Sequence, residues 1–176
     1  MVQYPMNKVI LGIGISGAGK STILQKFADE NKYYYISVDE IRGELSGDPK
    51  DQHHNSEAWD IAKRLLKYMY EGDKTIVFDA TLAKKEDRVN FLGFLKDNGV
   101  SKVQGVFVDT PLEVAKKRNE NRDRIVKDSS IELMDKNLKE APPSVSEGFD
   151  SIFRLDENAK IIGVETRTPD PEITKV

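Results

Sequence analysis

The sequence of 176 residues contains no cysteine, and this absence excludes disulfide bonds, thiolate metal sites and cysteine nucleophiles. It also lacks any apolar run that approaches the roughly 18 residues of a membrane span. The amino terminus has no basic flank followed by a long apolar segment, which is the pattern of a secretory signal. We therefore expect a cytoplasmic protein with no membrane partner.

Neither the small net charge nor the histidine content indicates a function by itself. The formal net charge of −3 supplies no global attraction to nucleic acid, so a polyanionic partner has to meet a local basic surface. The only histidines, His53 and His54, are adjacent in a polar segment. Neighbouring loop side chains point in different directions, and no acidic or sulfur partner lies at ligand spacing, so the pair does not predict a metal site.

The most informative stretch is Gly14-Ile15-Ser16-Gly17-Ala18-Gly19-Lys20-Ser21, which has the spacing of a phosphate-binding P-loop. It follows the apolar run 9–13 and precedes a predicted helix over 22–31. Glycines let the backbone turn sharply and aim its N–H groups at an anion, to which the helix adds its positive dipole end. We expect Lys20 to reach the β- and γ-phosphates and the Ser21 hydroxyl to be a Mg²⁺ ligand. The predicted contacts to a nucleoside triphosphate come from Gly14, Ser16, Gly17, Ala18, Gly19, Lys20, Ser21 and Thr22.

Apolar strands alternate with amphipathic segments along the chain, which predicts an α/β domain with a mostly parallel sheet. We expect one domain over residues 1–166 and a loose tail over 167–176, because the tail carries two prolines and few apolar residues. A loop is expected over 43–52. The predicted strands are 8–15, 33–38, 75–78, 102–108, 152–155 and 160–163, and the predicted further helices are 39–42, 55–70, 84–97, 110–121 and 131–140.

Three of these strands end in an aspartate, namely Asp39, Asp79 and Asp109. Ligands of open parallel sheets bind outside the carboxyl ends of the strands, which makes each aspartate a candidate site residue. Each one also precedes a helix, so each is equally suited to capping that helix. Spacing alone does not rank them.

Several further segments resemble the 5′-kinase domain of phage and bacterial polynucleotide kinases and, more broadly, small P-loop kinases. The resemblance implies a three-layer P-loop NTPase fold with a helical lid, and a kinase that uses ATP and Mg²⁺ to phosphorylate a hydroxyl. It extends over about residues 8–155. It is carried by the P-loop together with Ser37-Val38-Asp39-Glu40-Ile41-Arg42, Phe78-Asp79-Ala80-Thr81 followed by Arg88, Val108-Asp109-Thr110-Pro111 leading to Arg118-Asn119 and Arg122, and Pro142-Pro143-Ser144-Val145-Ser146-Glu147-Gly148-Phe149-Asp150.

The resemblance also implies roles for individual residues. Asp39 would be the general base for the acceptor hydroxyl, and Arg42 would hold the acceptor's neighbouring phosphate. Asp79 would be a Mg²⁺-directed carboxylate beside Ser21 and would support the acceptor site together with Arg88. Lys20 and the lid residue Arg122 would be catalytic, and Arg118 would bind the nucleotide. Without the resemblance, these arginines are ordinary solvated helix residues, and Asp109 is assigned to structure.

The acceptor is less well defined than the donor. We expect the 5′-OH of a polynucleotide end, but Leu82 stands where the resembling kinases often have Asn after D-A-T. That departure and the acidic balance favour a first alternative, a small-molecule kinase acting on a sugar, nucleoside or antibiotic alcohol. A second alternative is a nucleotide-binding switch or ATPase that transfers nothing, which would need the P-loop but no base at Asp39.

Overall fold

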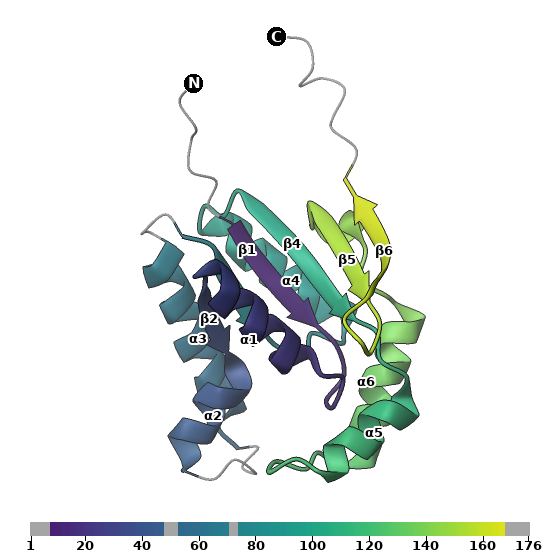
Figure 1. Cartoon of the computed structure of the whole chain (residues 1–176). Coiled ribbons are helices and arrows are strands. Elements are labelled where there is room, and N and C mark those ends of the chain that lie inside the picture. Colours follow the sequence, from purple (N-terminus) through teal and green to yellow (C-terminus); the bar gives the residue numbers. More distant parts are fainter. Residues whose placement is uncertain (1–7, 48–52, 71–73, 168–176) are drawn as a thin grey trace.

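The computed structural model describes residues 8–47, 53–70 and 74–167. Its centre is a six-stranded sheet in the order β2-β3-β1-β4-β5-β6 (Figure 1). β2, β3, β1, β4 and β5 pair in parallel, and β6 pairs antiparallel to β5. The strands are β1 (Lys8–Ile13), β2 (Tyr34–Ser37), β3 (Ile76–Asp79), β4 (Lys102–Val108), β5 (Ser151–Leu155) and β6 (Ile161–Thr166).

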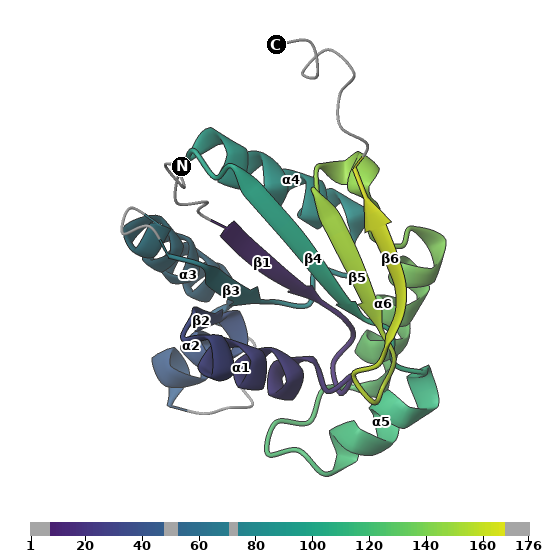
Figure 2. The same cartoon turned by 45° about the horizontal axis from the view of Figure 1, so that its top comes forward.

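Helices connect the strands and form two outer layers. They are α1 (Lys20–Asn31), α2 (Val38–Ser46), α3 (Asn55–Tyr70), α4 (Lys85–Asp97), α5 (Leu112–Glu120) and α6 (Asp128–Glu140), followed by a short 3₁₀ turn, η1 (Val145–Glu147). α1 lies on one face of the sheet, and α4 and α6 lie on the other (Figures 1 and 2). The predicted α/β class and the mostly parallel sheet are confirmed. Among the described residues, no helix is both long and apolar enough to cross a membrane.

Side chains along the buried strands point alternately to the two faces of the sheet, so the core consists of one cluster on each face. A small cluster of Ile10, Leu24, Ala28 and Val77 joins the sheet to α1. The larger cluster lies on the opposite face, where Trp59 of α3 and Phe91 of α4 contact each other and Phe78 of β3. Because β1 is covered on both faces, it has a nearly continuous apolar sequence instead of an alternating one.

The strand order reverses at β1, and this positions the site. The chain leaves β1 through α1 to reach the β2 edge, whereas β3 is followed by α4 and then β4 on the other side of β1. In open parallel sheets a crevice forms at such a point, outside the carboxyl ends of the strands. The P-loop therefore begins at the place where this topology favours a ligand.

The element bounds differ from the predictions in one place that matters for the site. Residues 43–46 continue α2 instead of beginning a loop, and the helix ends at Gly47, whose φ of 67° suits glycine. Of the predicted loop, residues 48–52 lie outside the described residues. The predicted tail also lies outside them except for Arg167, whose backbone N–H donates to the Asp150 carbonyl.

Candidate functional site

The P-loop connects β1 to α1 and bends at two glycines with left-handed backbone, Gly17 (φ 83°) and Gly19 (φ 86°). A Cβ on Gly17 would lie 2.2 Å from the Ala115 carbonyl oxygen of α5, so only glycine fits this close approach. Tertiary hydrogen bonds fix the loop further. The Gly14 N–H donates to the Thr81 carbonyl over 3.2 Å, and the buried Thr110 hydroxyl donates to the Ala18 carbonyl over 2.7 Å.

The loop encloses a cavity of about 220 Å³ that has the features of an anion site. Gly19 is the N-cap of α1 and offers no side-chain acceptor, and the first turn of the helix contains no acidic residue. The unpaired N–H groups and the positive dipole end of α1 are therefore left to a ligand. The cavity is lined by residues 15–22 together with Asp39, Thr81, Arg118 and Arg122.

Lys20 and Asp79 form a buried ion pair beneath this cavity, in which Lys20 Nζ contacts Asp79 Oδ1. The other carboxylate oxygen, Oδ2, accepts a hydrogen bond of 2.6 Å from the Tyr35 hydroxyl. Burial, the Asp79 charge and that hydrogen bond raise the pKa of Tyr35 above its ordinary value, so the phenol stays a donor. Asp79 is far from the cap of α4, which begins at Lys85, and the capping interpretation of Asp79 is wrong.

Asp39 lies in the first turn of α2, and its carboxylate does not cap the helix. That task belongs to Ser37, whose hydroxyl accepts from the Glu40 N–H at 3.3 Å. The Asp39 side chain is 46% exposed and lines the P-loop cavity. It is therefore accessible to an incoming molecule beside the predicted position of the phosphates.

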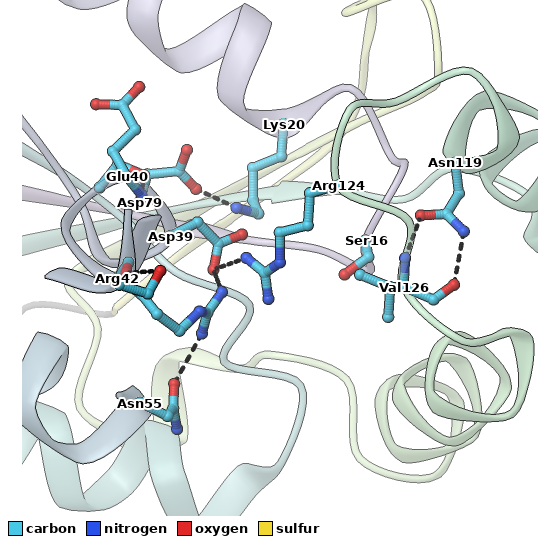
Figure 3. A network of polar contacts seen from close by, with 12 residues as sticks. Ser16, Lys20, Asp39, Glu40, Arg42, Asn55, Asp79, Asn119, Arg124 and Val126 are labelled. Carbon is cyan, nitrogen blue, oxygen red and sulfur yellow. Dashed lines mark hydrogen bonds and ion pairs between the residues drawn. The ribbon is translucent and has the colours of Figure 1, made fainter. Parts of the chain in front are cut away.

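Two arginines contact the same oxygen of Asp39. Arg42 Nη2 of α2 contacts Oδ1, and Arg124 Nη1, from the loop between α5 and α6, lies 3.0 Å from it (Figure 3). Asn55 at the start of α3 accepts from Arg42 Nη1 at 2.9 Å, so its side chain orients Arg42. Burial favours a raised pKa for Asp39, but the charges of Arg124, Arg42 and Lys20 outweigh it and hold that pKa below its ordinary value. Asp39 is thus an anion at neutral pH.

The segment from α5 to α6 passes over the P-loop and supplies the predicted lid arginines. Arg118 Nη1 donates to the Ala18 carbonyl and Nη2 to the Glu157 carbonyl, each over 3.1 Å. Arg122 also lines the cavity. The loop is closed at its base by the buried Asn119, which donates from Nδ2 to the Val126 carbonyl over 2.7 Å and accepts from the Val126 N–H at 3.0 Å (Figure 3).

Arg88 is placed differently from the prediction that it binds the acceptor. Its side chain is fully buried and forms a bidentate ion pair with Glu147 over 2.7–2.8 Å. The remaining N–H groups donate to the carbonyls of Leu82, Ala83 and Ala141, so all five guanidinium donors are used within the protein. In this arrangement Arg88 fastens α4 to the segment before β5 and has no donor left for an acceptor.

Two other residues also have positions that bear on the predictions. Asp109 accepts from the Arg154 guanidinium, and its N–H donates to the Leu155 carbonyl over 2.8 Å, in keeping with the structural assignment.

Leu82 is buried with a φ of 46°, a left-handed conformation that asparagine adopts more readily than leucine. The Asn-to-Leu departure therefore brings backbone strain and an apolar side chain to a loop beside the cavity.

The donor set fits a magnesium ion shared with phosphates. In the part of the chain that the structure describes, no group of three or more His, Cys, Asp or Glu side chains has the arrangement of a metal centre. Mg²⁺ bound with a nucleotide needs only one or two protein oxygens, because the phosphates and water supply the rest. Ser21, at the start of α1, and Asp79, at the end of β3, are the residues that would hold it.

The sequence did not reveal the roles of Tyr35, Asn55 and Arg124, because each depends on a tertiary contact. Tyr35 reads as one more residue of an aromatic strand, and Arg124 as one member of a basic cluster. A local signal for the true cap of α2 was present, since Ser37 followed by Glu40 three residues later is a capping-box pattern.

Comparison with known proteins agrees with this arrangement. The model of the AAA_33 family, an AAA domain, matches residues 9–141. The chain belongs to this AAA domain family. A search of curated proteins gave no match.

Solved structures that resemble this AAA domain share its fold at low sequence identity. A chain of the Pnkp1/Rnl/Hen1 RNA repair complex is 18% identical with a TM-score of 0.69, over 98% of this chain and 52% of that one. A chain of the PezAT toxin–antitoxin system of Streptococcus pneumoniae is 18% identical with a TM-score of 0.67, over 98% and 78%. A sugar kinase from Janibacter is 19% identical with a TM-score of 0.60, over 86% of each chain. The AAA domain thus has the P-loop kinase-like fold and spans about half of the RNA repair chain.

Proposed function

We propose that this AAA domain is an ATP-dependent kinase that transfers the γ-phosphoryl group to an alcohol. The observation that carries the proposal is that Asp39, an exposed carboxylate with a lowered pKa, opens onto the same cavity as the P-loop. A switch protein that transfers nothing has no need of such a carboxylate. Its position supports the kinase over the non-transferring alternative.

In the proposed reaction, Lys20 leaves Asp79 for the β- and γ-phosphates when the nucleotide binds. The Asp39 carboxylate accepts the hydroxyl proton while the acceptor oxygen bonds to the γ-phosphorus and the bond to the β-phosphate oxygen breaks, releasing ADP. A low pKa makes Asp39 a weak base. This suits a loose transition state, in which the oxygen loses its proton late and positioning supplies most of the rate.

Arg122 and the Mg²⁺ ion complete this proposal. Arg122 lines the cavity from the lid side and would stabilise charge on the transferring group. When bound, Mg²⁺ supplies charge neutralisation between the β- and γ-phosphates. Arg118 would bind the nucleotide from the position where it now donates to the P-loop carbonyl of Ala18.

For the acceptor, we propose the 5′-OH of a polynucleotide end. The support is the D-x-x-R arrangement of Asp39 and Arg42, in which a buried cation lies beside the proposed base. A small-molecule alcohol is the second candidate, and it is favoured by Leu82, which puts a buried apolar side chain where the resembling kinases often have an amide. The RNA repair complex and the sugar kinase among the structural neighbours represent these two classes.

An acceptor screen with γ-labelled ATP tests the proposal. The panel contains a 5′-OH RNA oligonucleotide, the matching DNA, the same RNA with a 5′-phosphate, free nucleosides and simple sugars. We expect label on the 5′-OH ends and none on the 5′-phosphorylated control. Labelling of sugars or nucleosides alone would establish the small-molecule kinase, and ATP hydrolysis without any labelled acceptor would contradict a kinase.

A further inference from the structure

Tyr35 of β2 reaches the candidate metal site from within the sheet. β2 pairs in parallel with β3, so that Tyr35 lies opposite Val77, two residues before Asp79. Side chains two residues apart on a strand share a face, and Tyr35 packs against the small cluster that contains Val77 and lies under α1. The phenol therefore extends forward along this face to the Asp79 carboxylate, where its hydroxyl donates to Oδ2 over 2.6 Å.

The two oxygens of Asp79 have partners that differ in their freedom to move. Oδ1 contacts Nζ at the end of the long Lys20 side chain, which leaves for the phosphates in the proposed reaction (Figure 3). Oδ2 contacts the Tyr35 hydroxyl, whose ring is packed against the core. Because the Asp79 side chain is only 1% exposed, a lost donor is not replaced by bulk water. Of the two contacts, that of Tyr35 is the one that still orients the carboxylate after Lys20 has left.

The same hydroxyl also faces Ser21, the second residue that would hold the metal. Burial is the largest cause that raises the pKa of the Tyr35 phenol, and Asp79 raises it further, whereas an interaction with the Ser21 hydroxyl lowers it. A hydroxyl has one proton to donate, and Tyr35 directs it to Asp79. Toward Ser21 the phenol oxygen therefore acts as an acceptor, which leaves the lone pairs of the serine oxygen for a cation.

We propose that Tyr35 is a positioning residue of the magnesium site. Its hydroxyl holds Asp79 so that Oδ1, once vacated by Lys20, faces the cation, and it turns the lone pairs of Ser21 toward the same point. Removal of a residue that hydrogen-bonds to metal ligands without touching the metal commonly lowers metal affinity by about 10–100-fold. The inference rests on the proposed binding of a nucleotide with Mg²⁺ and adds to that site a residue outside the P-loop.

Tyr35→Phe removes the hydroxyl and keeps the ring, so it tests the hydrogen bonds without opening a cavity. Calorimetry measures the dissociation constant of a non-hydrolysable ATP analogue, once with Mg²⁺ and once with EDTA. The ratio of the EDTA constant to the Mg²⁺ constant reports the contribution of the metal to binding. We expect Tyr35→Phe to lower this ratio by about 10-fold or more and to leave the EDTA constant nearly unchanged.

Tyr33→Phe is the matched control. It makes the same chemical change two residues away, at a ring that packs against the same small cluster and contacts Phe27, and it should leave the ratio unchanged. A partly unfolded preparation lowers the number of sites in both titrations and does not affect the ratio. An unchanged ratio in Tyr35→Phe, or an equal loss of affinity with Mg²⁺ and with EDTA, would overturn the proposal, because a merely structural tyrosine affects both constants alike.

A double-mutant cycle with Asp79→Asn tests whether Tyr35 acts through this aspartate. In the Asp79→Asn protein, the further change Tyr35→Phe should alter the ratio by less than about twofold, because the carboxylate that it positions is already gone. An undiminished effect of Tyr35→Phe in that protein would contradict the proposed role.

The binding measurements separate this inference from the proposed kinase. A wild-type protein that transfers phosphate to no acceptor would contradict the kinase and leave the comparison of binding ratios valid. A wild-type protein that binds the analogue equally well with Mg²⁺ and with EDTA would overturn the role of Tyr35 even in an active kinase.

Discussion

Replacing Glu147 by glutamine should destabilise the protein strongly without affecting recognition of the acceptor. The Arg88 and Glu147 side chains are 0% and 1% exposed, and they are joined by two hydrogen bonds. Glutamine keeps one oxygen acceptor but replaces the other by an amide donor that faces the buried Arg88 cation, and breaking such a buried pair costs about 3–5 kcal/mol. At 2–4 °C per kcal/mol for a chain of this size, the melting temperature should fall by roughly 6–20 °C.

Chemical denaturation and calorimetry measure this loss, with Glu113→Gln as the matched control. Glu113 is 86% exposed and lies 4.0 Å from Lys116, so its replacement should change the free energy of unfolding by no more than about 0.5 kcal/mol. At a temperature where both variants are folded, the KM for the acceptor should equal that of wild type. Normal stability of Glu147→Gln, combined with a raised acceptor KM, would refute the structural role of Arg88.

Two further perturbations test the P-loop and the electrostatics of the base. Gly17→Ala should weaken ATP binding and cost at least about 1–2 kcal/mol of stability, because its φ of 83° is strained for alanine and its Cβ would meet the Ala115 carbonyl. Gly99→Ala, also at a φ of 83° but with open space around it, should cost stability alone, and equal ATP affinity in both variants would contradict this account. The pH profile of kcat/KM tests the charges around Asp39. Because the pKa of Asp39 is lowered, its carboxylate stays ionised at pH values below the ordinary pKa of an aspartate. The stability that its ion pairs contribute is lost as the pH falls through that lowered pKa. Arg124→Gln should move the acid limb to higher pH, and an unshifted limb would show that Asp39 does not control it.

The P-loop was predictable from the sequence because its conformation depends on residues that are adjacent in the chain. Its eight residues are contiguous, its glycines carry the left-handed backbone, and the helix that completes the anion site follows at once. Asp39 and Asp79 were also within reach of the sequence, since both come at the ends of apolar strands. The structure excludes the capping interpretation of both, because Ser37 caps α2 and α4 begins well after Asp79, and their roles in the site stay a proposal.

The positions of the arginines were not predictable, because long-range contacts determine them. Arg88 has the sequence context of a surface helix residue, yet its partner Glu147 is 59 residues away and buries it completely. Arg124 belongs to a segment with few apolar residues, and only the tertiary structure brings it to Asp39. The extension of α2 past Gly43 was missed because glycine lowers helix propensity, whereas Ser46 bonds back to the Arg42 carbonyl near the helix end.

Asp39→Asn tests the central claim most directly, when ATP binding and phosphoryl transfer are measured on the same preparation. The amide keeps the shape of the carboxylate but accepts no proton and carries no charge. The dissociation constant for ATP should be unchanged or lower, since a negative charge beside the phosphates is removed, while kcat should fall by about 100-fold or more. Transfer near the wild-type rate, with ATP still bound, would contradict the assignment of Asp39 as the base.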